Sequence, residues 1–239
     1  MEKKKVSKNI TNKNLNFTDY ELNSLSFEEA KINDKRTFFQ YYISLIKTKH
    51  LLVYTFYSIN DNNSIIIKIC LFLFSFSTLY IINGLFFTDK TMHKIYVDNG
   101  IFNFVYLIPQ IIYSTIISSI INAVIKYLSL INKIITDIKK YNYKTASQKF
   151  TRIQKIIKIK FILFFIISFI ILGLYWYYVS CFCAVYKNTQ IILLEDTLIS
   201  FGLSLVYPLF IYLIPGVARI PALNDSKACY KISKILQLL

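Results

Sequence analysis

The 239-residue sequence has few charged side chains and few of the residues that interrupt helices. Charged residues make up 17% of the chain, whereas a soluble domain carries about 25%. Glycine occurs 5 times and proline 4 times, while tyrosine and phenylalanine occur 19 and 20 times. Such a bias is typical of an AT-rich genome, so the abundance of lysine and tyrosine is weak evidence for any particular function. The shortage of charge itself argues against an ordinary soluble domain.

Sequence signatures of catalysis, metal binding and nucleotide binding are also missing. His50 and His93 lie in different segments, and His93 has no neighbouring serine, cysteine or carboxylate pattern that would make it a catalytic base. Cys181 and Cys183 are too few to hold a metal ion, which needs about four ligands. We interpret these two cysteines as small apolar residues. The sequence therefore predicts no cofactor, no metal and no enzymatic activity.

Four long apolar stretches are what the sequence does contain. Each is long enough for a helix to cross roughly 30 Å of hydrocarbon, and Lys68 is the one charged side chain inside them. The stretches do not alternate in the way that strands of a membrane β-barrel do. The sequence therefore predicts an all-α integral membrane protein with four transmembrane helices, at Ile65–Phe87, Phe104–Ile125, Phe161–Tyr186 and Leu198–Val217.

The flanking segments differ from these spans in composition. Residues 1–25 are polar and rich in asparagine, and we predict that they are disordered. Residues 26–60 are predicted to form cytoplasmic or interfacial helices, beginning at a capping box of Ser26 and Glu29 and including a helix over Lys35–His50 that lies on the membrane. A half-inserted fifth segment continuing to Tyr57 is the alternative. Residues 65–217 form the membrane domain, and residues 221–239 are predicted to form a basic amphipathic helix.

The distribution of lysine and arginine predicts the orientation. The loop between the second and third spans is strongly basic, and its apolar periodicity predicts a helical hairpin over residues 128–160. In the two shorter loops, acidic residues balance or outnumber the basic ones. Because short basic loops stay in the cytoplasm, the hairpin and both termini are predicted to be cytoplasmic. Lys68, near the start of the first span, is expected to snorkel to the headgroups.

One face of the second span is polar. Ser114, Ser118 and Asn122 follow one another at four-residue spacing, and Gln110 extends the same face by a turn. Small polar residues at this spacing favour close helix packing, but the same face could line a water-filled path or a small-molecule site. No acidic residue is predicted deep in any span, which argues against a proton-coupled pump or a cation site.

The basic surfaces outside the spans could bind anionic lipid or a calmodulin-like partner, or they could serve only as topology signals. The net charge of +15 flanks membrane segments and comes without a nucleic-acid-binding motif, so anionic lipid is a better partner than nucleic acid. Cys229 lies in the basic tail and is a candidate for S-acylation. The candidate lipid contacts are Lys139, Lys140, Lys149, Arg152 and Lys155 of the hairpin and Lys227, Lys231 and Lys234 of the tail.

Several short strings resemble a family of multi-span membrane proteins from single-celled eukaryotes that has no assigned activity. The resemblance covers most of residues 26–239, implies the same multi-span architecture, and transfers no site residues. The strings are Asp34-Lys35-Arg36-Thr37-Phe38, Gln40-Tyr41-Tyr42, Asn83-Gly84-Leu85-Phe86-Phe87, Thr91-Met92-His93-Lys94-Ile95-Tyr96, Cys181-Phe182-Cys183-Ala184-Val185-Tyr186, Ile214-Pro215-Gly216 and Arg219-Ile220-Pro221.

Two classes of function are compatible with these features. The first is a non-enzymatic scaffold, assembly partner or accessory subunit that acts through its basic cytoplasmic surfaces. The second is a small channel or carrier that uses the polar face of the second span. Because four spans enclose little space, the second class would require a homo-oligomer or another membrane protein as partner.

Overall fold

The computed structural model describes residues 17–57, 61–99, 104–139, 143–187 and 189–237. These residues are almost entirely helical, and no strand occurs among them. The helices are α1 (Asp19–Ser24), α2 (Phe27–Asn33), α3 (Phe38–Lys49), α4 (Leu51–Phe56), α5 (Ile65–Leu85), α6 (Asp89–Val97), α7 (Phe104–Ser129), α8 (Asn132–Lys139), α9 (Tyr143–Val185), α10 (Gln190–Ile211), α11 (Leu213–Asp225) and α12 (Lys227–Leu236).

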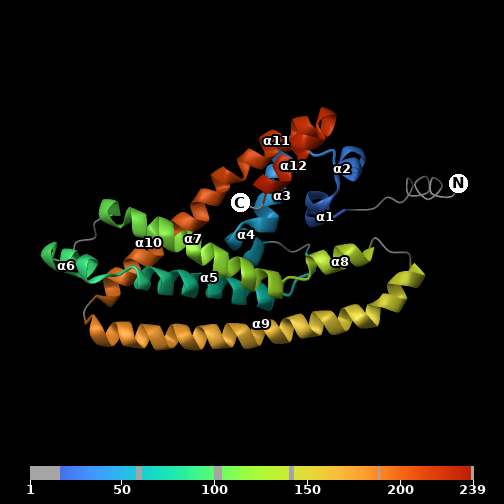
Figure 1. Cartoon of the computed structure of the whole chain (residues 1–239). Coiled ribbons are helices and arrows are strands. Elements are labelled where there is room, and N and C mark those ends of the chain that lie inside the picture. The colour runs from blue at the N-terminus through green and yellow to red at the C-terminus, as the bar shows by residue number, and fades with distance from the viewer. Residues whose placement is uncertain (1–16, 58–60, 100–103, 140–142, 188, 238–239) are drawn as a thin grey trace.

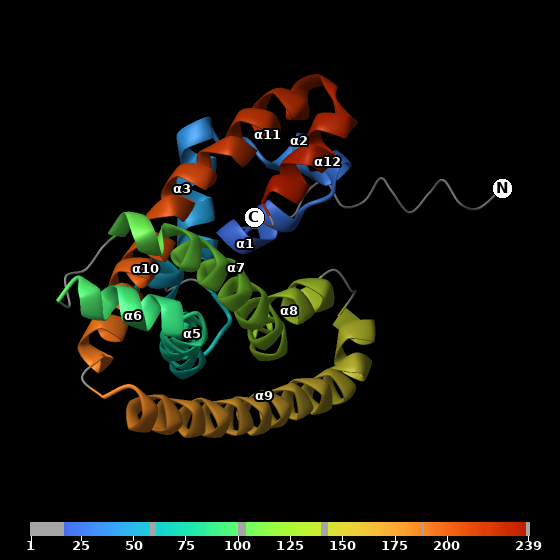
Figure 2. The same ribbon diagram turned by 60° about the vertical axis from the view of Figure 1, so that its left-hand side comes forward.

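Four helical segments are long and apolar enough to cross a membrane, the last of them running through α10 into α11, which confirms the all-α membrane fold. They contain Ile65–Leu85, Val105–Ser129, Phe150–Val185 and Gln190–Leu223. The helix α5 is the centre of the bundle and packs against α7, α9 and α10 (Figure 1). In the most apolar 18-residue stretch of α9, 6% is buried, whereas 44% of the corresponding stretch of α5 is buried. The helix α9 therefore lies on the outside of the bundle and offers most of its surface to lipid (Figure 2).

The predicted hairpin differs from the observed connection between the second and third spans. One arm is a direct continuation of the third span, because α9 runs without a break for 43 residues. The other arm, α8, is separated from α7 at Leu130 and Ile131. The break is held by side-chain amides: the Ile131 N–H donates to Asn63 Oδ1 at 2.9 Å, and the Asn62 N–H donates to Asn132 Oδ1 at 3.1 Å. Such bonds compete with the helical backbone pattern.

The helix of the fourth span is interrupted at Tyr212, between two of its prolines. The helix α10 ends at Ile211 and α11 begins at Leu213, between Pro208 and Pro215. Proline lacks the N–H that a continuous helix needs. Two side chains from the N-terminal region contact backbone carbonyls of α10 before this interruption. The Tyr42 hydroxyl donates to the Leu209 carbonyl at 3.0 Å, and His50 Nε2 lies 2.7 Å from the Leu205 carbonyl.

The two terminal regions fold together at one end of the bundle. The helices α1, α2 and α3 pack with α11 and α12 (Figures 1 and 2). The capping box of Ser26 and Glu29 is confirmed at the start of α2. The predicted disorder of residues 1–25 is wrong for α1, because a capping box of Thr18 and Glu21 starts that helix and its side chains dock on α3. Residues 1–16 lie outside the described residues.

Two other predicted boundaries shift. The interfacial helix expected over Lys35–His50 is α3, and it stops where His50 caps the next helix, α4. The C-terminal helix expected from residue 221 is α12, which begins at Lys227, because Pro221 lies inside α11 and the Ser226 hydroxyl caps α12. The face of α12 that packs on α11 carries Tyr230 and Ser233, both buried.

Candidate functional site

The polar face of the second span points into the bundle. Gln110, Ser114 and Ser118 are buried, and Asn122 is half-buried. The Ser114 hydroxyl donates back to the Ile111 carbonyl at 3.0 Å. The oxygens Ser118 Oγ and Asn122 Oδ1 are buried without a hydrogen-bond partner. The four predicted residues thus lie on a side of α7 that is buried or half-buried, and Gln110 contacts both α5 and α10.

At one end of this face, five side chains from three helices form a polar cluster. It consists of Asn83 from α5, Gln110 from α7, and Asp196, Thr197 and Ser200 from α10. Gln110 Nε2 donates to Asp196 Oδ2 at 3.0 Å and to the Asn83 carbonyl at 3.5 Å. Asn83 Nδ2 donates to Thr197 Oγ1 at 3.4 Å and to Ser200 Oγ at 3.2 Å. The Asp196 side chain, which is 0% exposed, has one oxygen without a partner.

The structure moves the start of the fourth span toward the N-terminus and places Asp196 inside the bundle. The predicted span began at Leu198, which left Glu195 and Asp196 in the preceding loop. The helix instead begins at Gln190, so Asp196 lies inside a continuous apolar segment. Glu195 is exposed, whereas Asp196 points toward Gln110. A hydropathy average could not separate two adjacent carboxylates on different faces of one helix.

An apolar layer covers the polar cluster at the end of the bundle where α6 lies. Its centre is Phe87, Phe182 and Leu193, and Met92 and Ile95 of α6 pack against them. Tyr178 of α9 lies over Gly84, where an added Cβ would come within 3.1 Å of the ring. Because Leu193 lies on α10 one turn before Asp196, this layer borders the polar cluster.

The second buried polar site joins the two terminal regions, and we call it the terminal junction. Asp34, which follows α2, accepts hydrogen bonds from Arg219 Nε and Nη2 of α11 at 3.1 and 2.7 Å. It also accepts from Arg36 Nε at 2.7 Å and Nη2 at 2.8 Å. The Arg219 guanidinium, 0% exposed, lies between the rings of Tyr41 and Tyr230 at 4.8 and 4.9 Å.

Further hydrogen bonds complete this junction. Arg36 Nη1 donates to Asn23 Oδ1 at 3.0 Å and to Ser44 Oγ at 2.8 Å. Arg219 Nη2 donates to the Leu22 carbonyl at 3.0 Å, and the Tyr230 hydroxyl donates to the Leu25 carbonyl at 3.0 Å. Five helices are therefore linked through one network. Sequence reasoning did not find it, because the partners Asp34 and Arg219 are 185 residues apart.

The charges of the terminal junction shift the pKa of its acid. Burial alone would raise the pKa of Asp34, but hydrogen bonds and charge from Arg36 and Arg219 outweigh it and hold the pKa below its ordinary value. At the edge of the junction, Lys49 Nζ donates to the Gln237 carbonyl. Burial, with a smaller contribution from the charge of Lys126, lowers the pKa of Lys49 to about 8.

Lys68, which was expected to snorkel to the headgroups, has a partner within the protein. Its Nζ lies 2.5 Å from Asp61 Oδ1 and 4.8 Å from the centre of the Tyr54 ring, and its side chain is 3% exposed. Asp61 lies in the described residues 61–64 that precede α5, close enough to pair with Lys68. The prediction treated Lys68 alone and had no means of locating this carboxylate.

The candidate lipid-binding residues lie on two surfaces. Arg152 and Lys155 are exposed on the part of α9 that leads into the third span, and Lys227 and Lys231 are exposed on α12 beside Cys229. Lys234 is half-buried and donates to the Ser24 carbonyl at 3.1 Å. Lys140 and the side chains of Lys139 and Lys149 lie outside what the structure describes.

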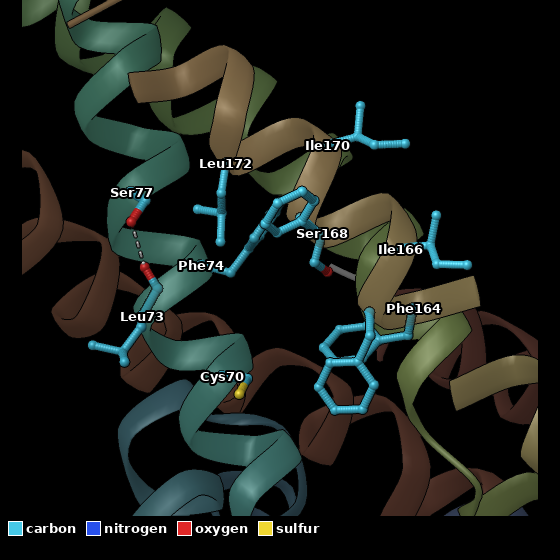
Figure 3. Close-up of a pocket in the computed structure, with 11 residues that line it drawn as sticks. Cys70, Leu73, Phe74, Ser77, Phe164, Ile166, Ser168, Ile170 and Leu172 are labelled. Carbon is cyan, nitrogen blue, oxygen red and sulfur yellow. Dashed lines mark hydrogen bonds between the residues drawn. The ribbon is translucent and has the colours of Figure 1, made fainter. Parts of the chain in front are cut away.

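An apolar groove of about 630 Å³ lies between α5 and α9 (Figure 3). Phe74, Phe164 and Leu172 line it, and the described residues around it include no charged side chain. The Ser168 hydroxyl is buried there without a partner. Such a lining suits hydrocarbon and offers no acid, base or anion-binding group for chemistry.

No group of three or more histidine, cysteine or acidic side chains that could hold a metal occurs in the described part of the chain. Neither a protein-family model, nor a curated protein, nor a solved structure matches this sequence. The resemblance to multi-span membrane proteins therefore stays a prediction. Its strings nevertheless meet in two places: those containing Asp34, Tyr41 and Arg219 at the terminal junction, and those containing Gly84, Met92 and Phe182 around the apolar layer.

Proposed function

We propose that the protein is a non-enzymatic multi-pass membrane scaffold or assembly subunit that presents a folded helical platform on the cytoplasmic side. The observation that carries this proposal is the terminal junction, where Asp34 and Arg219 join helices from both ends of the chain. A buried and hydrogen-bonded ion pair of this kind is costly to break. It fixes α1–α3, α11 and α12 as one rigid surface on which a partner could assemble.

The charge distribution supports the proposed orientation. Arg152, Lys155 and Lys158 are exposed on α9, and Lys227 and Lys231 are exposed on α12. Each basic residue near an anionic membrane surface contributes about 1 kcal/mol to binding. We propose that these two surfaces hold the platform against anionic lipid with both termini in the cytoplasm.

Lipid adducts in native mass spectrometry test this part of the proposal. Replacing Arg152, Lys155 and Lys158 by glutamine should weaken phosphatidylserine binding about tenfold or more and leave phosphatidylcholine binding unchanged. A matched variant changes Lys90 and Lys187, which are exposed and belong to the predicted outer loops, and it should bind phosphatidylserine like wild type. Equal losses in both variants would remove the assigned role of the α9 surface.

A small channel or carrier remains the second candidate. Ser118 Oγ and Asn122 Oδ1 favour it, because buried oxygens without protein donors are the usual binding places of internal water. The burial of Gln110, Ser114 and Ser118 inside the bundle favours the scaffold, because it leaves these polar side chains between helices.

Cysteine accessibility separates the two candidates. In a variant lacking the four native cysteines, Ser118→Cys and Asn122→Cys should resist a membrane-impermeant thiol reagent if the face is a packing surface. Ile116→Cys and Ile120→Cys, on the exposed side of α7, are the controls for lipid-facing positions. Labelling confined to Ser118→Cys and Asn122→Cys would favour the water-filled path and overturn the scaffold.

A further inference from the structure

We propose that Asp196 is a proton-binding site within the membrane domain and that the folded protein holds a proton on its carboxyl. The inference goes beyond the scaffold role and does not depend on it. It rests on the hydrogen-bond inventory of the polar cluster and on the side chains that surround the carboxyl.

All donor hydrogens of the cluster are already used. The two amide groups of Asn83 and Gln110 provide four, and the hydroxyls of Thr197 and Ser200 provide two. The amide hydrogens go to Thr197 Oγ1, Ser200 Oγ, Asp196 Oδ2 and the Asn83 carbonyl. The hydroxyls donate to the carbonyls of Leu193 and Asp196 at 2.8 and 2.7 Å. Two acceptors, Asp196 Oδ1 and Asn83 Oδ1, are buried without a donor.

One additional proton corrects this shortage. A carboxylate is acceptor-only, whereas a carboxylic acid offers one O–H donor. Protonation of Asp196 therefore removes a buried negative charge and converts one of the two unsatisfied oxygens into a donor. Leaving the carboxyl ionised would require a fully buried charge to stay with a single amide donor from the described helices, which is unfavourable.

No cation approaches Asp196 from the described helices around it. On α5, the titratable side chain at this level is Tyr80, and α7 contributes Tyr106. The neighbouring Glu195 is exposed, and Tyr178 of α9 covers Gly84. On α6, Lys90 and His93 are exposed, and Lys94 pairs with Asp98 at 3.3 Å. The basic side chains of α6 are therefore exposed or paired with Asp98, and they do not stabilise an ionised carboxylate at Asp196.

A proton fits the cluster better than a metal cation does. Hard cations such as Ca²⁺ and Mg²⁺ take six or more oxygen ligands at short distances. The oxygens still open here are Asp196 Oδ1 and Asn83 Oδ1, because the hydroxyls of Thr197 and Ser200 already accept from Asn83 Nδ2. Sodium is the remaining competitor, and the experiment below includes it.

Labelling with dicyclohexylcarbodiimide tests the proposal on the full-length protein in membranes. This apolar reagent adds to a protonated carboxyl, and the O-acylisourea rearranges to an N-acylurea that retains the whole reagent without a leaving group. Peptide mass spectrometry should find the adduct on Asp196 in wild type and in Glu195→Gln, and not in Asp196→Asn. Above the pH at which the proton leaves, labelling should fall about tenfold per pH unit.

The thermal midpoint of unfolding gives a second readout that does not need the reagent to enter. Because the folded state would bind a proton that the unfolded state releases, wild type should lose stability relative to Asp196→Asn as the pH rises. The proposal is overturned if Asp196 is unlabelled at acidic pH and this difference is independent of pH. It is also overturned if sodium chloride, but not choline chloride, blocks labelling, because the ligand would then be sodium.

Discussion

Each of the two buried polar sites of this protein holds a buried aspartate side chain, but the two aspartates have different partners. At the terminal junction, the carboxylate of Asp34 faces Arg36 and Arg219 and accepts five N–H groups from them. In the polar cluster, the carboxyl of Asp196 faces neutral partners and accepts one side-chain donor, from Gln110. Both side chains are almost fully buried. Because charges and hydrogen bonds also act on a buried acid, burial alone does not determine its protonation state.

The same substitution at the two sites should expose this difference most strongly. Asp34→Asn leaves the buried Arg219 without a counter-charge, and we expect a loss of about 3–5 kcal/mol in the free energy of unfolding. Asp196→Asn supplies the missing donor hydrogen and should cost little or stabilise. Thermal unfolding in detergent measures both, and Lys35→Gln, at an exposed neighbour, is the control for Asp34. Equal losses at the two aspartates would mean that the polar cluster, too, depends on an ionised carboxylate.

The pH dependence should have opposite signs at the two sites. The pKa of Asp34 is lowered in the folded protein. Its contribution to stability is therefore complete above the ordinary pKa of about 4 and is lost as the pH falls through the lower folded value. The difference between wild type and Asp34→Asn should shrink in acid. The penalty that Asp196 brings should instead grow as the pH rises.

The membrane spans could be predicted from sequence, whereas the two sites could not. Lipid requires a continuous apolar helix, and that requirement is visible in composition, which is why α5 and α7 begin within one residue of their predicted starts. The prediction missed Asp196 because charge was taken as the end of a span. It missed the terminal junction because the capping box of Thr18 and Glu21 was overlooked in a polar segment, and because the partners of residues 17–25 on α3 and α11 are distant in sequence.

The four-residue spacing, however, located the polar face of α7 correctly but did not show which helices this face contacts. Gln110 and Ser114 share a buried side of α7, as their spacing predicted. What that side faces depends on α10, whose register against α7 is fixed by Gln110 and Asp196. Such pairings between distant segments are set by packing of the whole bundle and leave no signal in a single sequence.

Glycine-to-alanine substitutions compare how tightly side chains pack at the terminal junction and near the polar cluster. A Cβ on Gly216 would come within 2.7 Å of the Phe38 ring at the junction, and we expect Gly216→Ala to cost about 1–3 kcal/mol. Near the polar cluster, Gly84→Ala should cost less, because its nearest atom is 3.1 Å away on Tyr178 of the loosely packed α9. Gly202, with nothing within 4 Å, is the control, and Gly202→Ala should stabilise by about 0.5–1 kcal/mol.

Thermal unfolding of the three alanine variants in one detergent provides the test. A junction that repacks freely would make Gly216→Ala indistinguishable from Gly202→Ala, and the platform would then be less rigid than proposed. A larger loss at Gly84 than at Gly216 would instead place the tighter packing around the polar cluster.

Substitution of Lys49 has the smallest expected effect on stability. It tests whether burying the Lys49 charge at the edge of the terminal junction costs more than the hydrogen bond to the Gln237 carbonyl contributes. The pKa of Lys49 is lowered from 10.5 to about 8 in the folded protein. Between these values the unfolded chain binds more protons, so the stability of wild type should rise with pH there. Lys49→Met removes this dependence and should raise the midpoint at neutral pH by about 2–4 °C, because partial exposure limits the gain to about 1 kcal/mol. Lys47→Met, at an exposed position on α3, should leave the slope unchanged. A loss of stability in Lys49→Met at every pH would mean that the bond from Lys49 to the Gln237 carbonyl outweighs the cost of burying the charge.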